Sequence, residues 1–523
     1  MPPDTDTTHS QHDQESAVQP SAGIEKAVAG SVEGPSSRTS KARSKIAPFT
    51  PNPAAKVKNA SGLPARSSRQ SVAPRPPALR PVALNLGIDF GTSFTKVCYR
   101  DIGTEESGVA AVGQGFKKAL VPSVVAVSQT GHLYLGDNAK APKSAVLVPY
   151  LKMRLAGAPI GDTLPAVAGL DLNQPECTKV LAAWFLASVI ARSQEWITLH
   201  ETDRLTNRKP VWSANVGVPV EHFDSLVLKT FEEVLGVAWL WVKDGHVPVS
   251  LQDAMAGYGP AVSRLKDEVT DFHAVPEIAA AVQSFVMSRE ALPGIYVYFD
   301  IGGGTVDGVA FNYLNRNGDR KIHFYSGKVE SLGISAIAAS IGEGASGVDA
   351  GKLESLLRNC PQTTQDDLVQ RIRRVVGEVV MTAKQKDGRN WQEDAIQSSD
   401  YERKYIGQLS TKRMRPLIVF IGGGGSKSSW YNAAIASTYT AFQHHNAGVP
   451  PYKLLEVPSP KDFSMPKVGD DDFTRFAISY GLSIPYGEGP EIGLPSQFAV
   501  AEKPRQWKPR GLVDYADSKD VYG

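Results

Sequence analysis

The sequence predicts an α/β protein with two lobes, preceded by a disordered arm. Three observations lead to this expectation. The composition changes sharply near residue 82, glycine loops follow predicted strands at three places, and a long apolar helix lies between the first two loops. The chain has 523 residues, and the part after residue 82 has ordinary apolar content and nearly balanced charge, so it is large enough for one two-lobed fold.

Residues 1–82 are rich in Ser, Pro, Ala, Thr and Gln and carry few large apolar side chains. Such a segment buries too little surface to offset its chain entropy, so we expect it to be disordered. No acidic residue occurs between Glu33 and Asp89, whereas ten Lys and Arg residues do. The arm could bind nucleic acid or an anionic surface, but the lack of interleaved aromatic residues favours a solvated basic linker.

The cysteine spacing, the first residues and the length of the apolar runs argue against disulfide-rich, zinc-binding, secreted and membrane-spanning proteins. Cys98, Cys177 and Cys360 are widely spaced, without Cys-x-x-Cys pairs, so neither a disulfide framework nor a zinc site is indicated. The first residues have no secretory pattern. The apolar run at 180–191 is too short to span a bilayer and predicts a buried helix. We therefore expect a cytoplasmic protein without a transmembrane segment.

The stretch LNLGIDFGTSFTKVCYRD at 84–101 predicts a hairpin of two strands. Apolar residues alternate with smaller or polar ones on both sides of a break at 89–92. An acidic residue followed by glycine is ordinary turn chemistry. Because D-x-G-T arises by chance about 0.1 times in a chain of this length, one copy by itself is weak evidence for a site.

Two further loops repeat the same layout. IYVYFDIGGGTVDGVAF at 295–311 again gives a strand, an aspartate, glycines, a threonine and a strand. Three consecutive glycines cost conformational entropy that a simple turn does not need, and successive N–H groups form a nest for anions. PLIVFIGGGGSKSSWYNAAI at 416–435 predicts a buried strand, a glycine loop and a helix from near Trp430, although four glycines are also typical of a flexible connector. Asp89 and Asp300, facing two phosphate cradles, suggest a Mg²⁺ ion between them.

Together the three loops resemble the two phosphate loops and the adenosine loop of the actin-like ATPase superfamily, which comprises actin, sugar kinases and DnaK-type heat-shock chaperones. Segments between the loops resemble the DnaK-type chaperones most closely, and they occur in family order. These segments are VPSVVAVSQTGHLYLGDNAK at 121–140, LKMRLAG at 151–157, VWSANVGVPVEHFDSLVLKTF at 211–231 and VPEIAAAV at 275–282.

The resemblance implies two lobes that close on Mg-ATP, each with a ribonuclease-H-like five-stranded mixed sheet and helices. We expect the arm at 1–82 and the ATPase domain at 83–487, with lobes at about 83–290 and 291–487. A Pro/Gly-rich tail at 488–523 follows, and it is too short for the peptide-binding domain of the chaperones.

The same resemblance assigns roles to individual residues. Asp89 and Asp300 would hold the Mg²⁺, mostly through water. Glu277 and Asp307 would orient or deprotonate the attacking water, and Lys152 would reach the γ-phosphate, unless a shifted alignment puts Met153 in its place. The expected phosphate-binding residues are Gly91, Thr92, Ser93, Gly302, Gly303, Gly304 and Thr305. The expected adenosine-binding residues are Glu378, Lys384, Gly422, Gly423, Gly424, Gly425 and Ser426.

Several features depart from the chaperone pattern. Lys96 lies seven residues after Asp89, the spacing of a phosphate-facing lysine in actin-like filaments and many sugar kinases, and it shares strand parity with Thr92. A second lysine on a triphosphate would stabilise developing charge. The arginine that stacks on adenine is missing, with Lys427 its nearest substitute. Residues 385–415 are short and polar where the family has a strand meander. Residues 237–272 add a surface helix pair that we expect to break at 257–260.

Four activities remain open. The first is a DnaK-like nucleotide-binding protein that hydrolyses ATP slowly and regulates an unidentified protein partner by opening and closing. Lys96 favours an actin-like filament-forming ATPase, whereas the LGDNAK and VPEIAAAV segments count against it. A small-molecule kinase lacks a clear acid for a substrate hydroxyl, and a nucleotide-sensing pseudo-ATPase would explain the irregular adenine side. In each case ATP and Mg²⁺ are the expected ligands, and the oligomeric state stays open.

Overall fold

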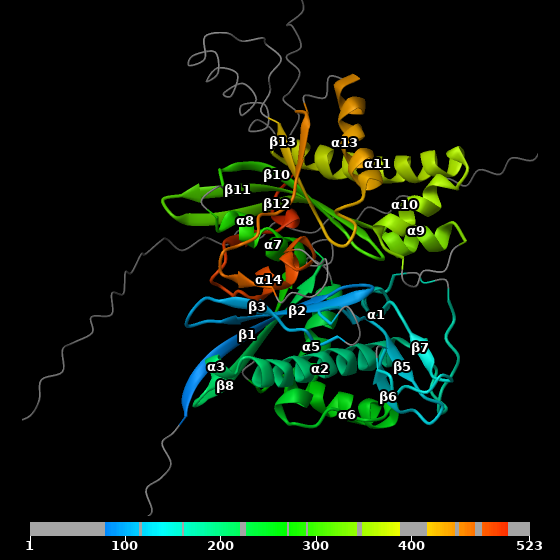
Figure 1. Ribbon diagram of the computed structural model, residues 1–523, viewed down its shortest axis with the longest axis vertical. Coiled ribbons are helices and arrows are strands. Elements are labelled where there is room, and N and C mark those ends of the chain that lie inside the picture. Colours follow the sequence, from blue (N-terminus) through cyan, green and yellow to red (C-terminus); the bar gives the residue numbers. More distant parts are fainter. Residues whose placement is uncertain are drawn as a thin grey trace, which may run out of the picture. The chain divides into compact units, whose positions relative to one another are not determined.

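A computed structural model of the protein describes residues 79–113, 118–136, 138–158, 160, 162–219, 226–268, 271–288, 291–342, 348–387, 416–444, 449–465 and 473–499. The fold is α/β, with two large sheets, one small sheet and helices packed on them (Figure 1). The expectations for the basic arm up to residue 78, the polar stretch at 388–415 and the chain end after residue 499 lie outside the described residues.

The first large sheet has the strand order β15-β3-β2-β1-β8-β9, with β4 also paired to β2. Strand β2 runs antiparallel to both of its neighbours, β1 and β3, whereas β1, β8 and β9 run parallel. The bounds are β1 Arg80–Phe90, β2 Phe94–Asp101, β3 Ser107–Val109, β4 Val121–Pro122, β8 Arg208–Val218, β9 Phe272–Pro276 and β15 Phe463–Ser464. The predicted hairpin at 84–101 is confirmed, with Leu84 opposite Asp101. The sheet starts earlier than expected, because Val82, assigned to the arm, is buried in the core.

The second large sheet has the order β14-β13-β10-β11-β12-β16. Strands β10, β11 and β12 are antiparallel, and β10, β13 and β14 are parallel. The bounds are β10 Gly294–Ile301, β11 Val306–Arg316, β12 Asp319–Glu330, β13 Leu417–Gly422, β14 Tyr452–Leu455 and β16 Glu491–Gly493. The central five strands of both large sheets therefore share one order: three antiparallel strands, then two strands parallel to the third.

Both sheets exceed the five strands expected from the sequence. Short strands from late in the chain extend their edges: β15 pairs with β3, and β16 pairs with β12. Strand β16 lies inside the predicted tail, so at least the first residues of that tail belong to the fold. Phe498 confirms this, because its ring packs against the ring of Tyr325 with centroids 5.3 Å apart. Covering an open sheet edge in this way satisfies backbone groups that would otherwise be unpaired.

A small antiparallel sheet and the helices complete the fold. The small sheet has the order β6-β5-β7, with β5 at Val125–Val127, β6 at Leu133–Leu135 and β7 at Val146–Val148. The helices in the first half are α1 Leu151–Leu155, α2 Pro175–His200, α3 Thr202–Leu205, α5 Leu226–Lys243, α6 Leu251–Arg264, α7 Glu277–Ala281 and α8 Gln283–Val286. Those in the second half are α9 Ile334–Ser340, α10 Ala350–Arg358, α11 Gln362–Asp387, α13 Ser429–His444 and α14 Ala477–Ser483, with the 3-10 helices η1 Phe473–Arg475 and η2 Pro495–Gln497. Within the described ranges, none of these helices has the length and apolar character needed to cross a membrane.

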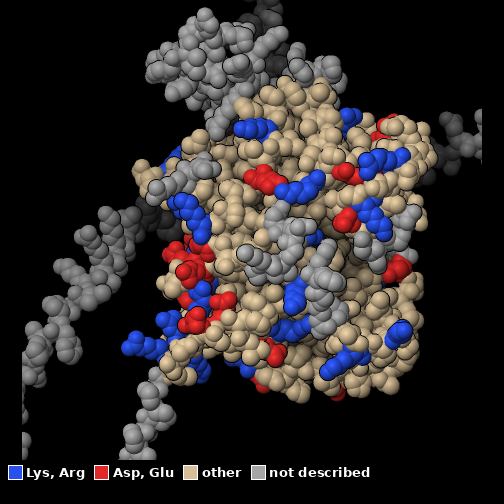
Figure 2. Space-filling model, in the orientation of Figure 1, with Lys and Arg blue, Asp and Glu red and all other residues tan. Residues whose placement is uncertain are grey.

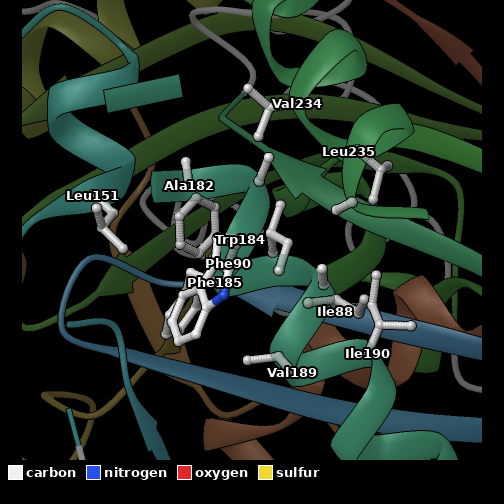
Figure 3. Close-up of a cluster of buried hydrophobic side chains, with 14 of the residues drawn as sticks. Ile88, Phe90, Leu151, Ala182, Trp184, Phe185, Val189, Ile190, Val234 and Leu235 are labelled. Atoms are coloured by element: carbon white, nitrogen blue, oxygen red, sulfur yellow. The ribbon is translucent and has the colours of Figure 1, made fainter. Parts of the chain in front are cut away.

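Helices α2 and α5 cover one face of the first sheet. Figure 3 shows Phe90 of β1 beside Phe185 of α2, and their ring centroids are 5.6 Å apart. Val234 and Leu235 of α5 belong to the same buried cluster. The predicted buried helix at 180–191 is therefore confirmed as the central part of α2.

Helix α14 lies against both the first sheet and α7 (Figure 1). A side chain on Gly87 of β1 would overlap the backbone oxygen of Ser479, and one on Gly481 of α14 would overlap the backbone oxygen of Ala280 in α7. Both contacts therefore join backbone to backbone. As a result, α14 holds the strand that carries Asp89 close to the helix that starts at Glu277.

The predicted break in the 237–272 segment is wrong. The structure has one continuous helix, α6, through Gly257 and Pro260. Leu251, Ala254 and Ala261 are buried in the cluster formed with α2 and α5. Because this buried face extends along the helix, tertiary packing outweighs the helix-breaking tendency of glycine and proline.

Candidate functional site

Two strand-end aspartates mark the site. Asp89 lies at the end of β1, the central strand of the first sheet, and Asp300 lies at the end of β10, its counterpart in the second sheet. The Asp89 side chain is buried at 3% exposed, whereas Asp300 is partly exposed.

The glycine loops that follow these strands contact each other. A side chain on Gly303 would overlap the Ser93 hydroxyl, and a Cβ on Gly304 would lie 2.5 Å from Cγ2 of Thr92. The carbonyl groups of Gly302 and Gly303 accept hydrogen bonds from the N–H groups at the start of α9 at 3.0 and 2.7 Å, so the carbonyl side of the second loop faces α9. The expected phosphate-binding residues of the first and second loops are thus brought together, and only glycine permits this approach.

The third glycine loop lies next to Asp300. Gly423 has a positive φ of 80°, and a Cβ there would lie 2.5 Å from Oδ1 of Asp300. Gly425 donates its N–H to the carbonyl oxygen of Ile301 at 2.9 Å. This placement follows from the parallel pairing of β13 with β10, which aligns Gly422 with Asp300.

Two lysines pair with carboxylates in the same region. Lys96 of β2 donates from Nζ to Oδ2 of Asp89, which lies directly opposite it in the hairpin register. Lys152 of α1 donates from Nζ to Oε1 of Glu277 at 2.5 Å, and both side chains are buried. We call the group formed by Asp89, Lys96, Lys152, Glu277, Asp300 and Asp307 the carboxylate–lysine cluster.

Burial dominates the electrostatics of this cluster. Desolvation raises the pKa of Glu277 to about 7, with Lys152 opposing and Asp89 adding to the effect. It raises the pKa of Asp300 to about 6 and that of Asp307 to about 8. Burial by itself would lower the pKa of Lys152, but Glu277, Asp307 and Asp89 outweigh it and raise that pKa above its ordinary value. Lys152 is therefore charged at neutral pH, and the carboxyl groups of Glu277, Asp300 and Asp307 titrate close to neutral pH.

One carboxylate oxygen of Asp307 is buried without a hydrogen-bond partner. Asp307 is 6% exposed, and the unpartnered atom is Oδ1. A buried carboxylate oxygen without a donor is costly, so its presence points to a partner that binds there, such as a water molecule or a ligand.

We expect replacement of Asp307 to change the pH dependence of stability. Between the ordinary pKa of 3.8 and the folded-state value of about 8, the folded chain holds a proton that the unfolded chain releases, so wild-type stability falls as pH rises through this window. In Asp307→Asn this contribution is absent. The variant should gain stability relative to wild type from pH 5 to pH 8, measured by urea unfolding without nucleotide or Mg²⁺. The exposed control Asp319→Asn should show no such trend, and a gain for Asp307→Asn that is equal at both pH values would contradict the assignment.

The N-terminus of α13 is not available to a phosphate. The Glu354 side chain of α10 accepts hydrogen bonds from the hydroxyl groups of Ser428 and Ser429 at 2.8 and 3.1 Å and from the N–H of Trp430 at 3.3 Å. A carboxylate already occupies this helix terminus, where an anion is most favourable. The third loop is thus unlike the anion-binding arrangement that its sequence pattern predicts.

Other residues expected on the adenosine side lie in separate places. Glu378 of α11 pairs with Lys328 of β12 at 3.5 Å, on the surface. Lys384 lies further along α11, where burial lowers its pKa. Lys427, the proposed substitute for the missing arginine, pairs with Glu456 at 2.7 Å and is largely exposed. Glu378 and Lys427 thus pair with Lys328 and Glu456, which are not members of the carboxylate–lysine cluster.

Sequence reasoning missed the part of the site that comes from η1. The N–H of Gly423 donates to the carbonyl oxygen of Thr474 at 3.4 Å, and the Thr474 and Ser426 hydroxyl groups are 3.3 Å apart. Arg475 places Nη2 3.6 Å from the position of a Cβ on Gly424. No local pattern around these residues signals a site, because the contacts join segments that are far apart in the chain.

The described residues contain no group of three or more His, Cys, Asp and Glu side chains arranged to hold a metal ion. A cation at Asp89 and Asp300 would need further oxygen ligands from a bound phosphate or from water, as is usual for Mg²⁺. A hollow of about 750 Å³ lies elsewhere, between β9, α8, the β11–β12 turn and β16. The cluster is a stronger candidate for a functional site than this hollow, because it combines buried charge with contacting glycine loops.

Figure 2 shows that acidic and basic side chains intermingle on the coloured part of the face in view. This face therefore gives no support to a nucleic-acid interface. Comparison with protein-family models and with curated proteins found no match to this chain. The cluster and its three loops are therefore the features that bear on function.

Proposed function

We propose that the protein binds Mg-ATP at the carboxylate–lysine cluster and hydrolyses it slowly, as a two-lobed DnaK-like nucleotide-binding protein of the actin-like ATPase superfamily. The observation that carries this proposal is the direct contact between two glycine loops, each of which follows a strand-end aspartate. If the two loops were ordinary hairpin turns, they would have no reason to contact each other. They belong to different sheets, and their contact lies beside buried carboxylates.

The sheet topology supports the same proposal. The central five strands of the two sheets have one common order, and equivalent central strands carry Asp89 and Asp300. A duplicated sheet with one acidic residue per copy is what the resemblance implies for a fold that closes on a nucleotide. Each half would then contribute one ligand and one phosphate loop.

The residues present fit a Mg²⁺ ion bound with a triphosphate. Asp89 and Asp300 would hold the ion together with phosphate oxygens and water, and two carboxylates are a usual protein contribution to such a site. When bound, Mg²⁺ would neutralise charge on the β- and γ-phosphate oxygens. Lys96 and Lys152, which pair with Asp89 and Glu277 here, would turn toward the phosphates and add positive charge.

Glu277 and Asp307 are suited to proton handling. A general base works best when its pKa lies near the operating pH, and burial raises both pKa values toward or above neutrality. The unpartnered Oδ1 of Asp307 can accept a hydrogen bond from the attacking water. Lys152 holds Glu277 in place through its ion pair.

The contact between the first and second glycine loops offers a way for the bound nucleotide to change the conformation of the protein. Ser93 and Gly303 touch, so a triphosphate between the loops requires them to move apart or turn. Such a movement would shift α14 and α7, which are packed backbone to backbone. A protein partner that binds one arrangement better would then respond to ATP and ADP differently. We expect this to occur in the cytoplasm.

The direct test is isothermal titration calorimetry with ATP and ADP, with and without Mg²⁺, followed by a phosphate-release assay. We expect Mg²⁺-dependent binding and slow turnover. Absence of binding to either nucleotide would refute the proposal, and binding without turnover would favour a nucleotide sensor. Because Lys96 lies in the cluster, an actin-like filament former stays the second candidate. Protein that sediments with ATP but not with ADP would favour it.

Replacing Lys96 should weaken nucleotide binding without abolishing it. Lys96→Ala removes one positive charge from the phosphate side and leaves Lys152 and the metal ligands in place. Loss of one charge-assisted hydrogen bond corresponds to about a tenfold rise in Kd for ATP. Titration calorimetry with Lys140→Ala as an exposed control would measure this. Unchanged affinity for Lys96→Ala would show that Lys96 serves only to neutralise Asp89.

A further inference from the structure

We propose that the hollow beside α8 is a second binding site, which takes a small uncharged ligand with an apolar body and an amide-type group. The N–H of this ligand donates to the side chain of Gln283, and its carbonyl oxygen accepts from Arg320. Among the described residues, the lining of the hollow and the carboxylate–lysine cluster have no member in common. The site is therefore independent of the proposed function.

The hollow has the size and the walls of a small-molecule site. Its volume is about 750 Å³, which is usual for ligand pockets. Val275 and Pro276 of β9, Ile484 after α14 and Ile492 of β16 supply apolar side chains to the lining. An apolar ligand body would remove these walls from contact with water, which favours binding.

Gln283 provides a buried acceptor that has no donor. It is the first residue of α8, is 5% exposed and lines the hollow. Its amide group packs against Gly489, where a Cβ would lie 2.6 Å from Nε2, so the side chain is held in place. Within the described part of the chain, Oε1 of Gln283 has no hydrogen-bond partner. A buried carbonyl oxygen without a donor is costly, which indicates that a donor binds there.

Arg320 provides a donor close to this acceptor. It lies at the start of β12, lines the hollow and donates from Nη1 to Sδ of Met287 at 3.1 Å. Sulfur is a weak acceptor, and the buried Nε of Arg320 has no partner among the described residues. Met287 comes four residues after Gln283, so the two side chains lie on one face of the helix with Cβ atoms about 6 Å apart. Because an amide carries its N–H and C=O on adjacent atoms, one amide group suits this acceptor and this donor together.

The charges at the rim favour an uncharged ligand. Asp319, Glu488 and Glu491 line the hollow and are exposed. Lys321 pairs with Asp319 at 3.7 Å and with Glu491 at 2.5 Å. Arg320 and Lys321 thus face three carboxylates, so an anionic ligand gains little from the rim. A cationic ligand would lie beside the guanidinium group of Arg320.

The experiment compares two probes that differ in one group. Acetanilide has a benzene ring, an N–H and a carbonyl group, whereas phenyl acetate has an ester oxygen in place of the N–H. Saturation-transfer NMR titrations measure the Kd of both probes for wild type, Gln283→Met, Arg320→Met and the matched control Arg316→Met, which lies at the exposed end of β11.

We expect wild type to bind acetanilide about tenfold more tightly than phenyl acetate, because the ester leaves Oε1 of Gln283 unpaired. This preference should vanish in Gln283→Met. Arg320→Met should weaken the binding of both probes by about tenfold, because both have the carbonyl group. Arg316→Met should bind both probes as wild type does.

A wild-type protein that binds neither probe, or binds both equally, would overturn the inference. A preference for acetanilide that persists in Gln283→Met would also overturn it, because another group would then recognise the N–H. Unchanged affinities in Arg320→Met would refute the role of Arg320.

Urea unfolding without probe separates a binding role of Gln283 from a structural one. Removal of an unpaired buried acceptor should leave the urea midpoint of Gln283→Met the same or higher. If Gln283 served only the fold, the midpoint would fall and the preference for acetanilide would stay. Should Gln283→Met fail to fold, the probe preference of wild type and the affinities of Arg320→Met still decide the outcome.

Discussion

Replacing Asp89 or Asp300 by alanine is expected to abolish Mg²⁺-dependent ATP binding and turnover. Each aspartate lies at the end of a central strand beside a glycine loop, and each would supply one of the two protein oxygens for the metal ion. A site with only two protein ligands keeps too little affinity when one is lost. Titration calorimetry and phosphate release measure the effect, and Asp319→Ala at the exposed start of β12 serves as a control.

We expect the loss of ATP binding to come from the missing metal ligand and not from unfolding of the protein. Burial disfavours the charged form of Asp300, so its replacement by alanine should leave the free energy of unfolding the same or higher without nucleotide. Wild type with excess EDTA should behave like the variants in ATP titrations. If protein with both aspartates replaced still hydrolyses ATP at the wild-type rate, the site assignment is wrong.

Replacing Gly481 by alanine is expected to lower the free energy of unfolding by about 3 kcal/mol or more. The new Cβ would overlap the backbone oxygen of Ala280, and no rotamer can relieve a clash between a Cβ and a backbone atom. Helix α14 would have to move away from α7, which begins at Glu277. Urea unfolding measures the stability, and ATP titration of any folded fraction measures the displacement of the site.

The control is Gly257→Ala in the middle of α6. A Cβ there has Trp241 as its nearest neighbour, at an ordinary contact distance of 3.7 Å. Because alanine favours the helix over glycine, this variant should be as stable as wild type or more so, by up to about 1 kcal/mol. Similar destabilisation by both replacements would show that the α14 contact has no special role.

The loops of the site could be predicted because each is a local pattern. A strand, an aspartate and a glycine turn are adjacent in the chain, so Asp89, Asp300 and the three loops can be predicted without knowledge of any long-range contact. The structure brings the first two loops together and places the third beside Asp300. Lys152 and Glu277 followed from the resemblance, and the structure pairs them.

The structure differs from the sequence-based predictions where packing outweighs a local preference, or where a contact leaves no local pattern in the sequence. Gly257 and Pro260 favour a break, yet the buried face of α6 keeps the helix continuous. Strand β15 is very short and pairs with β3, which lies in a distant part of the chain, so no periodicity could reveal it. Glu354 caps α13 from 74 residues away, and its sequence neighbours suggest only an ordinary surface helix.

The sequence by itself determined the central strands, their glycine loops and the acidic residue at the end of each, because these depend on neighbouring residues and on backbone freedom. Only the tertiary structure decided which charges meet: that Lys96 pairs with Asp89, that burial raises the pKa of Asp307 to about 8, and that Glu354 closes one helix terminus while Arg475 lies on the third loop. The physical reason is that desolvation and charge pairing depend on the distance in space between groups, and that distance is set by how the two sheets pack on α7 and α14.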